Sequence, residues 1–218
     1  MIKAVLFDLD GTLANSLFDL AASTNYAIGK FGFPAREAEE FKYFAGDGMA
    51  KMIERALPPE SNGADTVSKI MPLFLDYYGV HYCDNTKAYP GAVELIDALK
   101  ARGITVAVVT NKAQEMAEKV VTRLYGKRFD LIFGMREGFP AKPDPTATLA
   151  AMRELGVKPS ECVFVGDTEM DVKTGVNSGA YPVGVLWGFR ETDELLRGGA
   201  KEIINHPQEL LAIINKLG

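Results

Sequence analysis

Carboxylate, ammonium and hydroxyl side chains follow four short apolar segments of this 218-residue chain. In chain order they are Asp8 and Asp10, Thr110 and Asn111, Lys142, and Asp167 and Asp171. If the segments are parallel strands of one sheet, the loops at their carboxyl ends converge on one crevice. Four carboxylates gathered there repel one another strongly unless a cation lies among them. The sequence therefore predicts a cation site at this edge of a sheet.

The chemistry that suits such a cluster is phosphoryl transfer. Oxygen ligands favour Mg²⁺, which binds a few carboxylates and keeps positions for water and phosphate oxygens. A bound cation lowers the repulsion between an anionic nucleophile and a phosphate group. One aspartate can then form an aspartyl phosphate, while a second protonates the leaving oxygen and later activates water.

The segments that must position these residues alternate with helices along most of the chain. Residues 2–7 form an apolar run typical of a buried strand, and the alternation resumes after Tyr89-Pro90-Gly91. The pattern predicts strands at 104–110, 131–133, 162–166 and within 180–186, and helices at 91–101, 112–124, 144–155, 168–178 and 206–217. Such alternation predicts βαβ units. We therefore expect an α/β fold, a doubly wound parallel sheet with helices on both faces.

A second region interrupts this alternation. Residues 15–86 show helical periodicity from a candidate N-cap, Ser16, to a first helix end at Gly32, and they contain no convincing strand. The expected layout is an α/β core of residues 1–14 and 87–218, with an all-helical insert over residues 15–86. An insert after the first strand lies at the carboxyl end of the sheet, where a helical module can act as a lid.

The composition limits the remaining classes of function. Hydrophobic residues make up 47% and charged residues 24%, as in an ordinary globular protein, and the formal net charge is −5. This charge disfavours nucleic acid or an anionic membrane as the main partner, and no apolar run is long enough for a membrane span. Only two histidines are present, which excludes a histidine-rich metal site. Cys83 and Cys162 are interpreted as free thiols, and we expect a cytoplasmic protein without a signal peptide.

Four motifs together resemble the haloacid dehalogenase superfamily in its phosphatase branch. They are FDLDGTL, Thr110, Lys142-Pro143 and GDTEMD, which occur in this order along the chain. The resemblance implies a Rossmann-like catalytic core, a helical cap domain and Mg²⁺ as cofactor. It also implies Asp8 as nucleophile, Asp10 as general acid and base, Thr110, Asn111 and Lys142 as phosphate-binding residues, and Asp8, the Asp10 main-chain carbonyl, Asp167 and Asp171 at the metal. Asp171 would act there either directly or through the waters of the metal.

A stretch of the helical insert, YFAGDGMAKMIERAL, resembles the cap-domain motif of phosphoglycolate phosphatases. By this likeness Gly46, Asp47 and Gly48 would form a loop that selects the substrate. Lys51, Arg55 and the amides at the start of the following helix would be candidates to face a substrate carboxylate. The residues taken alone are also typical of a loop that opens an amphipathic core helix.

The leading hypothesis is a Mg²⁺-dependent phosphatase of a small phosphate monoester, with 2-phosphoglycolate as first candidate. The alternative is an inorganic pyrophosphatase or a broad-specificity sugar or nucleotide phosphatase of the same superfamily. A regulatory domain that accepts a phosphoryl group without turnover is a remote alternative. Asp10 argues against a dehalogenase, and Leu20, where similar phosphomutases carry a hinge histidine, argues against a mutase. Asn15 departs from the acidic residue of many relatives but lies outside the motifs. We expect a small-molecule phosphate ester as partner, and a monomer or homodimer.

Overall fold

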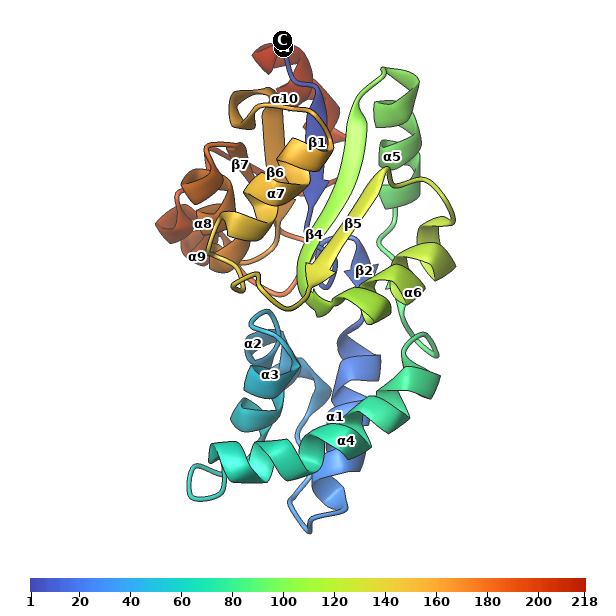
Figure 1. Cartoon of the computed structure of the whole chain (residues 1–218), viewed down its shortest axis with the longest axis vertical. Coiled ribbons are helices and arrows are strands. Elements are labelled where there is room, and N and C mark those ends of the chain that lie inside the picture. The colour runs from blue at the N-terminus through green and yellow to red at the C-terminus, as the bar shows by residue number, and fades with distance from the viewer. The chain divides into compact units, whose positions relative to one another are not determined.

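The computed structural model describes all 218 residues and divides them into two compact units. Met1–Ala14 and Ala88–Gly218 form an α/β unit, and Asn15–Lys87 form a helical unit (Figure 1). The chain passes between the units twice. These two crossings, β2 (Ala14–Asn15) and β3 (Lys87–Ala88), pair as a two-stranded sheet. The helical unit is thus an insertion that follows the first strand of the α/β unit.

The α/β unit is built on a six-stranded sheet of order β5-β4-β1-β6-β7-β8. Its strands are β1 (Ala4–Phe7), β4 (Thr105–Ala113), β5 (Leu131–Met135), β6 (Cys162–Gly166), β7 (Tyr181–Val185) and β8 (Glu202–Ile204). Every neighbouring pair runs parallel. From β1 the chain builds one side of the sheet with β4 and β5 and then the other side with β6 to β8. The loops after β1, β4 and β6 therefore meet where the strand order reverses, which is the usual ligand site of such sheets.

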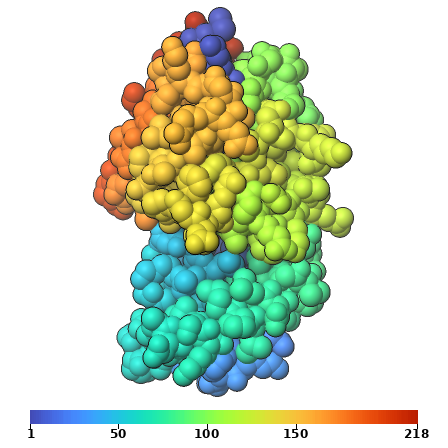
Figure 2. Space-filling model, in the orientation of Figure 1, coloured from blue at the N-terminus to red at the C-terminus, as the bar shows by residue number.

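The central strands are buried on both faces, which explains why they are continuous apolar runs. Leu6 of β1 shares a buried cluster with Met152 of α7 (Thr146–Glu154). Val5 and Phe7 alternate with Leu6 and are also buried. Figure 2 shows the yellow and orange segment that includes α7 covering one face of the α/β unit. The α/β class and the parallel sheet predicted from the sequence are confirmed.

The helices of the α/β unit follow the predicted alternation. In addition to α7 they are α5 (Ala92–Ala101), α6 (Gln114–Tyr125), α8 (Glu169–Ser178), α9 (Thr192–Gly198) and α10 (Glu209–Leu217), with a 3₁₀ turn, η2, at Pro159–Glu161. Several boundaries differ from the prediction. Strands β4 and β5 continue to Ala113 and Met135, α6 and α7 begin two residues later than expected, and α10 begins three residues later. The elements that were missed include α9 and β8, which have only seven and three residues and therefore give weak periodicity.

The helical unit contains α1 (Leu17–Gly29), η1 (Ala38–Glu40), α2 (Phe41–Phe44), α3 (Met49–Ala56) and α4 (Ala64–His81). Its core includes Ile28, Ile53 and Phe74, none of which is exposed to solvent. Ser16 occupies the N-cap position of α1 as predicted, although its side chain makes no capping hydrogen bond. The predicted end of this helix at Gly32 is wrong by three residues, since α1 ends at Gly29. None of the helices of the chain combines the length and apolar composition of a membrane span.

Candidate active site

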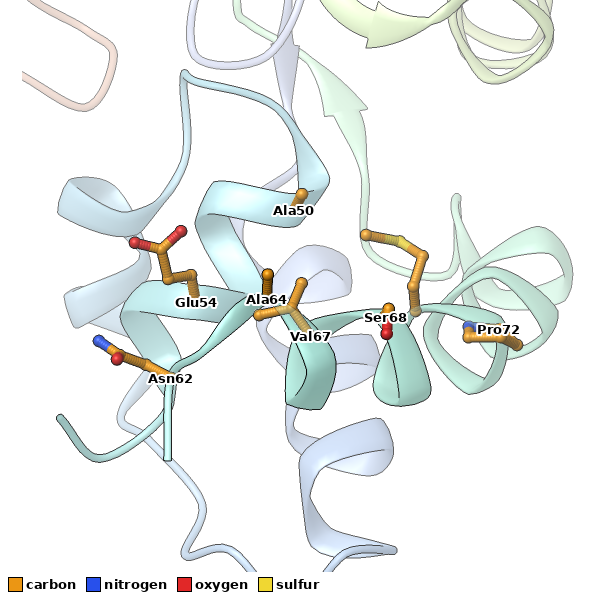
Figure 3. Close-up of a pocket in the computed structure, with 8 residues that line it drawn as sticks. Ala50, Glu54, Asn62, Ala64, Val67, Ser68 and Pro72 are labelled. Atoms are coloured by element: carbon orange, nitrogen blue, oxygen red, sulfur yellow. The ribbon is translucent and has the colours of Figure 1, made fainter. Parts of the chain in front are cut away.

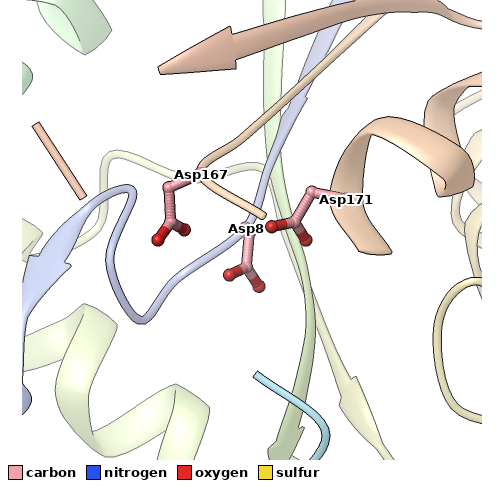
Figure 4. Close-up of side chains that lie close together, drawn as sticks. All are labelled: Asp8, Asp167 and Asp171. Carbon is pink, nitrogen blue, oxygen red and sulfur yellow. The ribbon is translucent and has the colours of Figure 1, made fainter. Parts of the chain in front are cut away.

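Three buried aspartates lie together at the carboxyl end of the sheet. Asp8 follows β1, Asp167 follows β6, and Asp171 lies in the first turn of α8. Figure 4 shows the three side chains reaching one region from these separate segments, and one carboxylate oxygen of each lies within 4.8 Å of the others. Strands β1 and β6 are paired neighbours, with Phe7 level with Val165, so the segments that carry Asp8 and Asp167 leave the sheet next to each other.

The Lys142 ammonium group joins two of these carboxylates. Its Nζ donates a hydrogen bond to Oδ1 of Asp8 and another to Oδ1 of Asp171, each at 2.6 Å. The Lys142 side chain is only 4% exposed, so little water screens the two ion pairs. The loop between β5 and α7 carries this lysine to the cluster. One buried cation therefore faces three buried carboxylates.

This imbalance of charge shifts the pKa values of the cluster. Burial, and next the repulsion from Asp171, raise the pKa of Asp8 to about 6 against the attraction of Lys142. Burial and the charges of Asp171 and Asp8 raise the pKa of Asp167 well above the ordinary carboxyl value. Burial lowers the pKa of Lys142, but the two carboxylates outweigh this effect and raise it. The three carboxylates are thus under-neutralised by protein charges, and a further cation would relieve their repulsion.

Hydrogen bonds fix the orientation of Asp167. The Thr12 hydroxyl donates to its Oδ1 at 2.9 Å, and the Phe189 main-chain amide donates to its Oδ2 at 2.8 Å. The indole Nε1 of Trp187 in turn donates to the main-chain oxygen of Thr12 at 2.9 Å. Thr12 was included in the sequence motifs only as part of FDLDGTL. The contact of the Phe189 amide could not be predicted from the sequence, because a main-chain donor does not depend on the type of side chain.

Protein donors also occupy both oxygens of Asp171. Its Oδ1 accepts from Lys142, and its Oδ2 accepts from the Thr168 amide at 3.0 Å and the Thr168 hydroxyl at 2.7 Å. Thr168 is the N-cap of α8, and the reciprocal bond from the Asp171 amide completes a capping box. The observed contacts of Asp171 thus orient Lys142 and start α8.

Glycines allow the backbone to pass unusually close to these carboxylates. A Cβ on Gly11, which has a φ of +91°, would lie 2.2 Å from Oδ2 of Asp167, and one on Gly188 would lie 2.3 Å from the Asp167 Cβ. A Cβ on Gly166 would lie 2.1 Å from the Asp171 Cβ. Side chains at these three positions would fill the space that the carboxylates occupy.

The predicted phosphate-binding pair after β4 lies inside this strand. Thr110 and Asn111 are each 6% exposed, and neither caps α6, whose N-cap is Ala113. The Asn111 Oδ1 accepts a hydrogen bond from the Lys142 main-chain amide at 2.8 Å. The contact observed for Asn111 therefore positions the loop that carries Lys142.

Asp10 has a buried partner that the sequence reasoning missed. The Nζ of Lys112 donates to both carboxylate oxygens of Asp10, at 3.1 Å and 2.9 Å. The side chain of Lys112 is 3% exposed and that of Asp10 is 17% exposed. Lys112 directly follows Thr110-Asn111, but a strand ending at residue 110 gave no reason to include it.

The remaining predicted residues, Gly46, Asp47 and Gly48, belong to the helical unit, where they connect α2 to α3. Arg55 of α3 pairs with the Asp47 carboxylate and donates to the Phe44 main-chain oxygen at 3.0 Å. The arginine thus braces the loop within its own unit.

The helical unit also contains a groove of about 600 Å³ between α3 and the start of α4. Figure 3 shows the side chains that line it, which are Ala50, Glu54, Asn62, Ala64, Val67, Ser68, Met71 and Pro72. Most of the lining surface is apolar. The groove holds no cluster of acidic or basic groups comparable to that of the α/β unit, so it offers no equivalent chemistry.

Comparison with known proteins gives a family match over most of the chain. The model of the haloacid dehalogenase-like hydrolases matches residues 5–185. An N-acetylmuramic acid 6-phosphate phosphatase from Pseudomonas aeruginosa is 31% identical over 217 residues, which cover 99% of this chain and 96% of the relative. A phosphoglycolate phosphatase from Chromobacterium violaceum is 33% identical over 214 residues, which cover 96% of this chain and 95% of the relative.

A solved structure extends the similarity to three dimensions. A protein from Lactobacillus delbrueckii subsp. bulgaricus, provisionally named a phosphoglycolate phosphatase, superimposes with a TM-score of 0.92 at 31% sequence identity. The match covers 97% of this chain and 98% of the other. The likeness therefore includes the helical insertion as well as the sheet.

Proposed function

Because the chain belongs to the haloacid dehalogenase-like hydrolase family, we propose that it is a Mg²⁺-dependent phosphatase that works through an aspartyl phosphate on Asp8. Its family and its relatives make the chain a phosphoric monoester hydrolase. The observation that carries the proposed mechanism is the buried cluster of Asp8, Asp167 and Asp171 with Lys142 bonded to the first and the last.

The residues of the cluster fit a magnesium ion. Their ligand atoms are all carboxylate oxygens, which suit Mg²⁺ better than a soft metal. Burial, and next the repulsion between the carboxylates, raise the pKa values of Asp8 and Asp167, so a bound cation would favour their charged forms. We propose that Asp8, Asp167 and the Asp10 main-chain carbonyl hold the ion, with Asp171 close to it. When bound, Mg²⁺ would neutralise charge on the phosphoryl group of the substrate.

In the first half of the proposed reaction, a carboxylate oxygen of Asp8 attacks phosphorus and the ester bond to the leaving oxygen breaks. Asp10 donates its proton to that leaving oxygen, so the alcohol departs neutral. Lys142 orients Asp8 through its hydrogen bond and presents positive charge to the phosphoryl oxygens. The hydroxyl of Thr110 is the proposed donor to the same group.

In the second half, water cleaves the aspartyl phosphate. The Asp10 carboxylate accepts a proton from the attacking water, which restores the acid for the next cycle. Inorganic phosphate leaves and the Asp8 carboxylate is regenerated. The same two aspartates therefore serve both halves with opposite proton transfers.

The leading candidate substrate is 2-phosphoglycolate. It is favoured by the phosphoglycolate phosphatases among the relatives and by the Gly46-Asp47-Gly48 loop of the helical unit. Arg55 and Lys51 each have an acidic partner within that unit, Asp47 and Glu54 respectively. The main-chain amides at the start of α3 are therefore the stronger candidates to meet a substrate carboxylate.

A second candidate substrate is N-acetylmuramic acid 6-phosphate. It is supported by the relative from Pseudomonas aeruginosa, which covers 99% of this chain. This compound is also a phosphate monoester with a carboxylate, so the site would have to bind the same two anionic groups. Pyrophosphatase activity and broad sugar or nucleotide phosphatase activity stay as alternatives. A cytoplasmic location and a monomeric or homodimeric state also belong to the proposal.

A substrate panel tests this proposal. We expect purified protein with Mg²⁺ to hydrolyse 2-phosphoglycolate with a higher kcat/KM than pyrophosphate, hexose phosphates, nucleoside monophosphates and N-acetylmuramic acid 6-phosphate. A higher value for the last compound would assign the second candidate. A higher value for pyrophosphate or a nucleotide would contradict both candidates but not the phosphatase mechanism, and no turnover of any ester would contradict the mechanism too.

A further inference from the structure

Lys112 is a buried lysine to which the mechanism above gives no role. Its side chain is 3% exposed, although an ammonium group is costly to remove from water. Its Nζ lies 3.1 Å from Oδ1 and 2.9 Å from Oδ2 of Asp10. A lysine at the surface would gain little from such a pair, but here the surrounding protein shields it from solvent.

The two aspartates of the first motif are thus each bonded to a different buried lysine. Lys142 donates to Asp8, and Lys112 donates to Asp10. Lys112 lies in β4 and Lys142 in the loop between β5 and α7, so the two aspartates are held by different segments of the chain.

The backbone of Asp10 is fixed by other contacts. Asp10 forms a bridge with Ala14, and the Gly11 amide donates to the Ala14 main-chain oxygen at 2.9 Å. The amides of Leu13 and Ala14 both donate to the Leu9 main-chain oxygen, at 2.9 Å and 2.8 Å. These bonds hold the main chain of this turn, whereas the Lys112 bonds act on the carboxylate of Asp10. Loss of Lys112 should therefore loosen the side chain of Asp10 and leave its main-chain carbonyl in place.

Lys112 is also linked to the proposed phosphate-binding hydroxyl. Its main-chain amide donates to Oγ1 of Thr110 at 3.3 Å. The pairing of β4 with β5 shifts register between Val109 and Ala113, within the stretch that carries both residues. One short, irregular strand end thus connects the Asp10 carboxylate to Thr110.

We propose that Lys112 is a positioning residue that holds the Asp10 carboxylate toward the leaving group through the ion pair of its Nζ with both carboxylate oxygens. The inference rests on the proposed phosphatase function and on Asp10 as its acid and base. In the acid form one oxygen of Asp10 carries the proton for the leaving oxygen, and the other oxygen can still accept from the Lys112 ammonium. The side chain therefore keeps one orientation in both protonation states. Without the two bonds from Lys112 the Asp10 side chain would be held in this orientation less firmly.

Lys112→Met tests this role because methionine keeps an unbranched, buried stem and removes the ammonium. Poor leaving groups need protonation, whereas p-nitrophenolate scarcely does. We expect kcat/KM for an alkyl phosphate such as 2-phosphoglycolate to fall about tenfold or more, and kcat/KM for p-nitrophenyl phosphate to change less than about threefold, because kcat/KM reports the steps up to the aspartyl phosphate. The Mg²⁺ concentration for half-maximal activity should stay within about twofold, because the main chain of Asp10 is held separately.

Three further variants keep the outcome interpretable. Lys112→Arg retains a cation and should recover part of the alkyl phosphate activity, which a merely structural defect would not predict. Lys119→Met, at an exposed lysine of α6 paired with Glu115, is the matched control and should behave as the unchanged protein. In an Asp10→Asn background, adding Lys112→Met should lower the alkyl phosphate activity by a further factor of less than about two. A residue that acts through Asp10 loses its effect when Asp10 is altered.

The outcomes separate this inference from the function on which it rests. Equal losses of kcat/KM on both substrate types, or a full additional loss in the Asp10→Asn background, would overturn the role of Lys112. If Lys112→Met does not fold, Lys112→Arg and Lys112→Gln take its place. Losses of activity in both of these variants that are equal for the two substrate types would also overturn the role of Lys112. If Asp10→Asn itself shows no selective loss on alkyl phosphates, the proposed role of Asp10 fails first.

Discussion

Gly166, the last residue of β6, faces Asp171 across a gap that admits no side chain. An added Cβ would lie 2.1 Å from the Asp171 Cβ and 2.4 Å from its Cγ, so the α8 turn would have to move. Asp171 holds Lys142, and Lys142 holds Asp8. A displacement at Gly166 therefore reaches the proposed nucleophile through two charged contacts.

We predict that Gly166→Ala lowers kcat by about 10²-fold, because misplacing a reacting group by about 1 Å has an effect of this size. It should also lower the free energy of unfolding by about 1–3 kcal/mol, as overpacking does. Steady-state kinetics and urea denaturation measure the two effects. Gly79→Ala is the control, since a Cβ there meets nothing within 4 Å. Full activity of Gly166→Ala would show that the position of Asp171 is not important.

At the scale of elements, Asp19 ties α1 to the segment that leads out of the helical unit. Its carboxylate accepts hydrogen bonds from the Asn85 amide and side chain and from the Thr86 amide and hydroxyl, at distances from 2.7 Å to 3.0 Å. Asp19 is 2% exposed. Burial raises the pKa of Asp19, but the hydrogen bonds from Thr86 and Asn85 outweigh it and hold the pKa below its ordinary value.

We predict that Asp19→Asn lowers the free energy of unfolding by about 2–3 kcal/mol at pH 7, because charge-assisted hydrogen bonds are lost. The folded protein binds the proton of Asp19 more weakly than the unfolded chain does. The stabilisation is therefore complete above the unfolded pKa of about 3.9 and disappears as the pH falls through the lower folded value.

Denaturation at several pH values measures how the free energy of unfolding differs between Asp19→Asn and the unchanged protein. The difference in free energy of unfolding between the two proteins should become smaller below about pH 4. Asp76→Asn, at an exposed position of α4, is the control and should have little effect. A gap that stays constant down to pH 2 would contradict the hydrogen-bonded carboxylate.

The loop that opens α3 has a backbone shape that requires glycine. Gly48, the N-cap of α3, has a φ of +88°, and Gly46 has a φ of +116°. A β-branched side chain is strained in this region, so Gly48→Val should distort the loop. If the loop selects the substrate, KM for 2-phosphoglycolate should rise about tenfold or more, and KM for p-nitrophenyl phosphate should change little.

Gly32→Val is the matched control for this loop. Gly32 lies in the same unit, has a φ of +81° and has nothing within 4 Å of an added Cβ. The control introduces the same backbone strain away from the loop. Similar changes of KM in both variants would mean that the Gly46–Gly48 segment does not select the substrate.

Strands with a strong local pattern were predictable, and irregular ends were not. The run CVFVG was assigned at the bounds of β6, because its fully buried residues form a continuous apolar segment. The end of β4 was placed too early, because Asn111 and Lys112 are polar and interrupt such a pattern. This error hid the contact of Lys112 with Asp10. Contacts made by main-chain amides, such as that of Phe189 with Asp167, also leave no trace in residue types.

At the scale of the whole molecule, the acidic cluster should make both activity and stability depend on Mg²⁺. We predict that excess EDTA abolishes turnover, and that Ca²⁺ restores it poorly because it prefers longer bonds and more ligands. Saturating Mg²⁺ at about 100 times its Kd should raise the free energy of unfolding by about 2.7 kcal/mol. Asp167→Asn should reduce this stabilisation in thermal denaturation. Full activity in EDTA would contradict the metal site.

The central claim is that Asp8 becomes phosphorylated during turnover. Rapid quenching in acid with ³²P-labelled substrate detects the phosphoenzyme. Reduction of a parallel sample with tritiated borohydride releases the phosphate, converts the phosphorylated aspartate into tritiated homoserine and so marks the site for peptide mapping. We predict one labelled site, Asp8, which forms within the first turnover and is lost on hydroxylamine treatment. Asp8→Asn should show no label and should lose activity by about 10³-fold or more. Label at another residue, or turnover by Asp8→Asn near the level of the unchanged protein, would contradict the account.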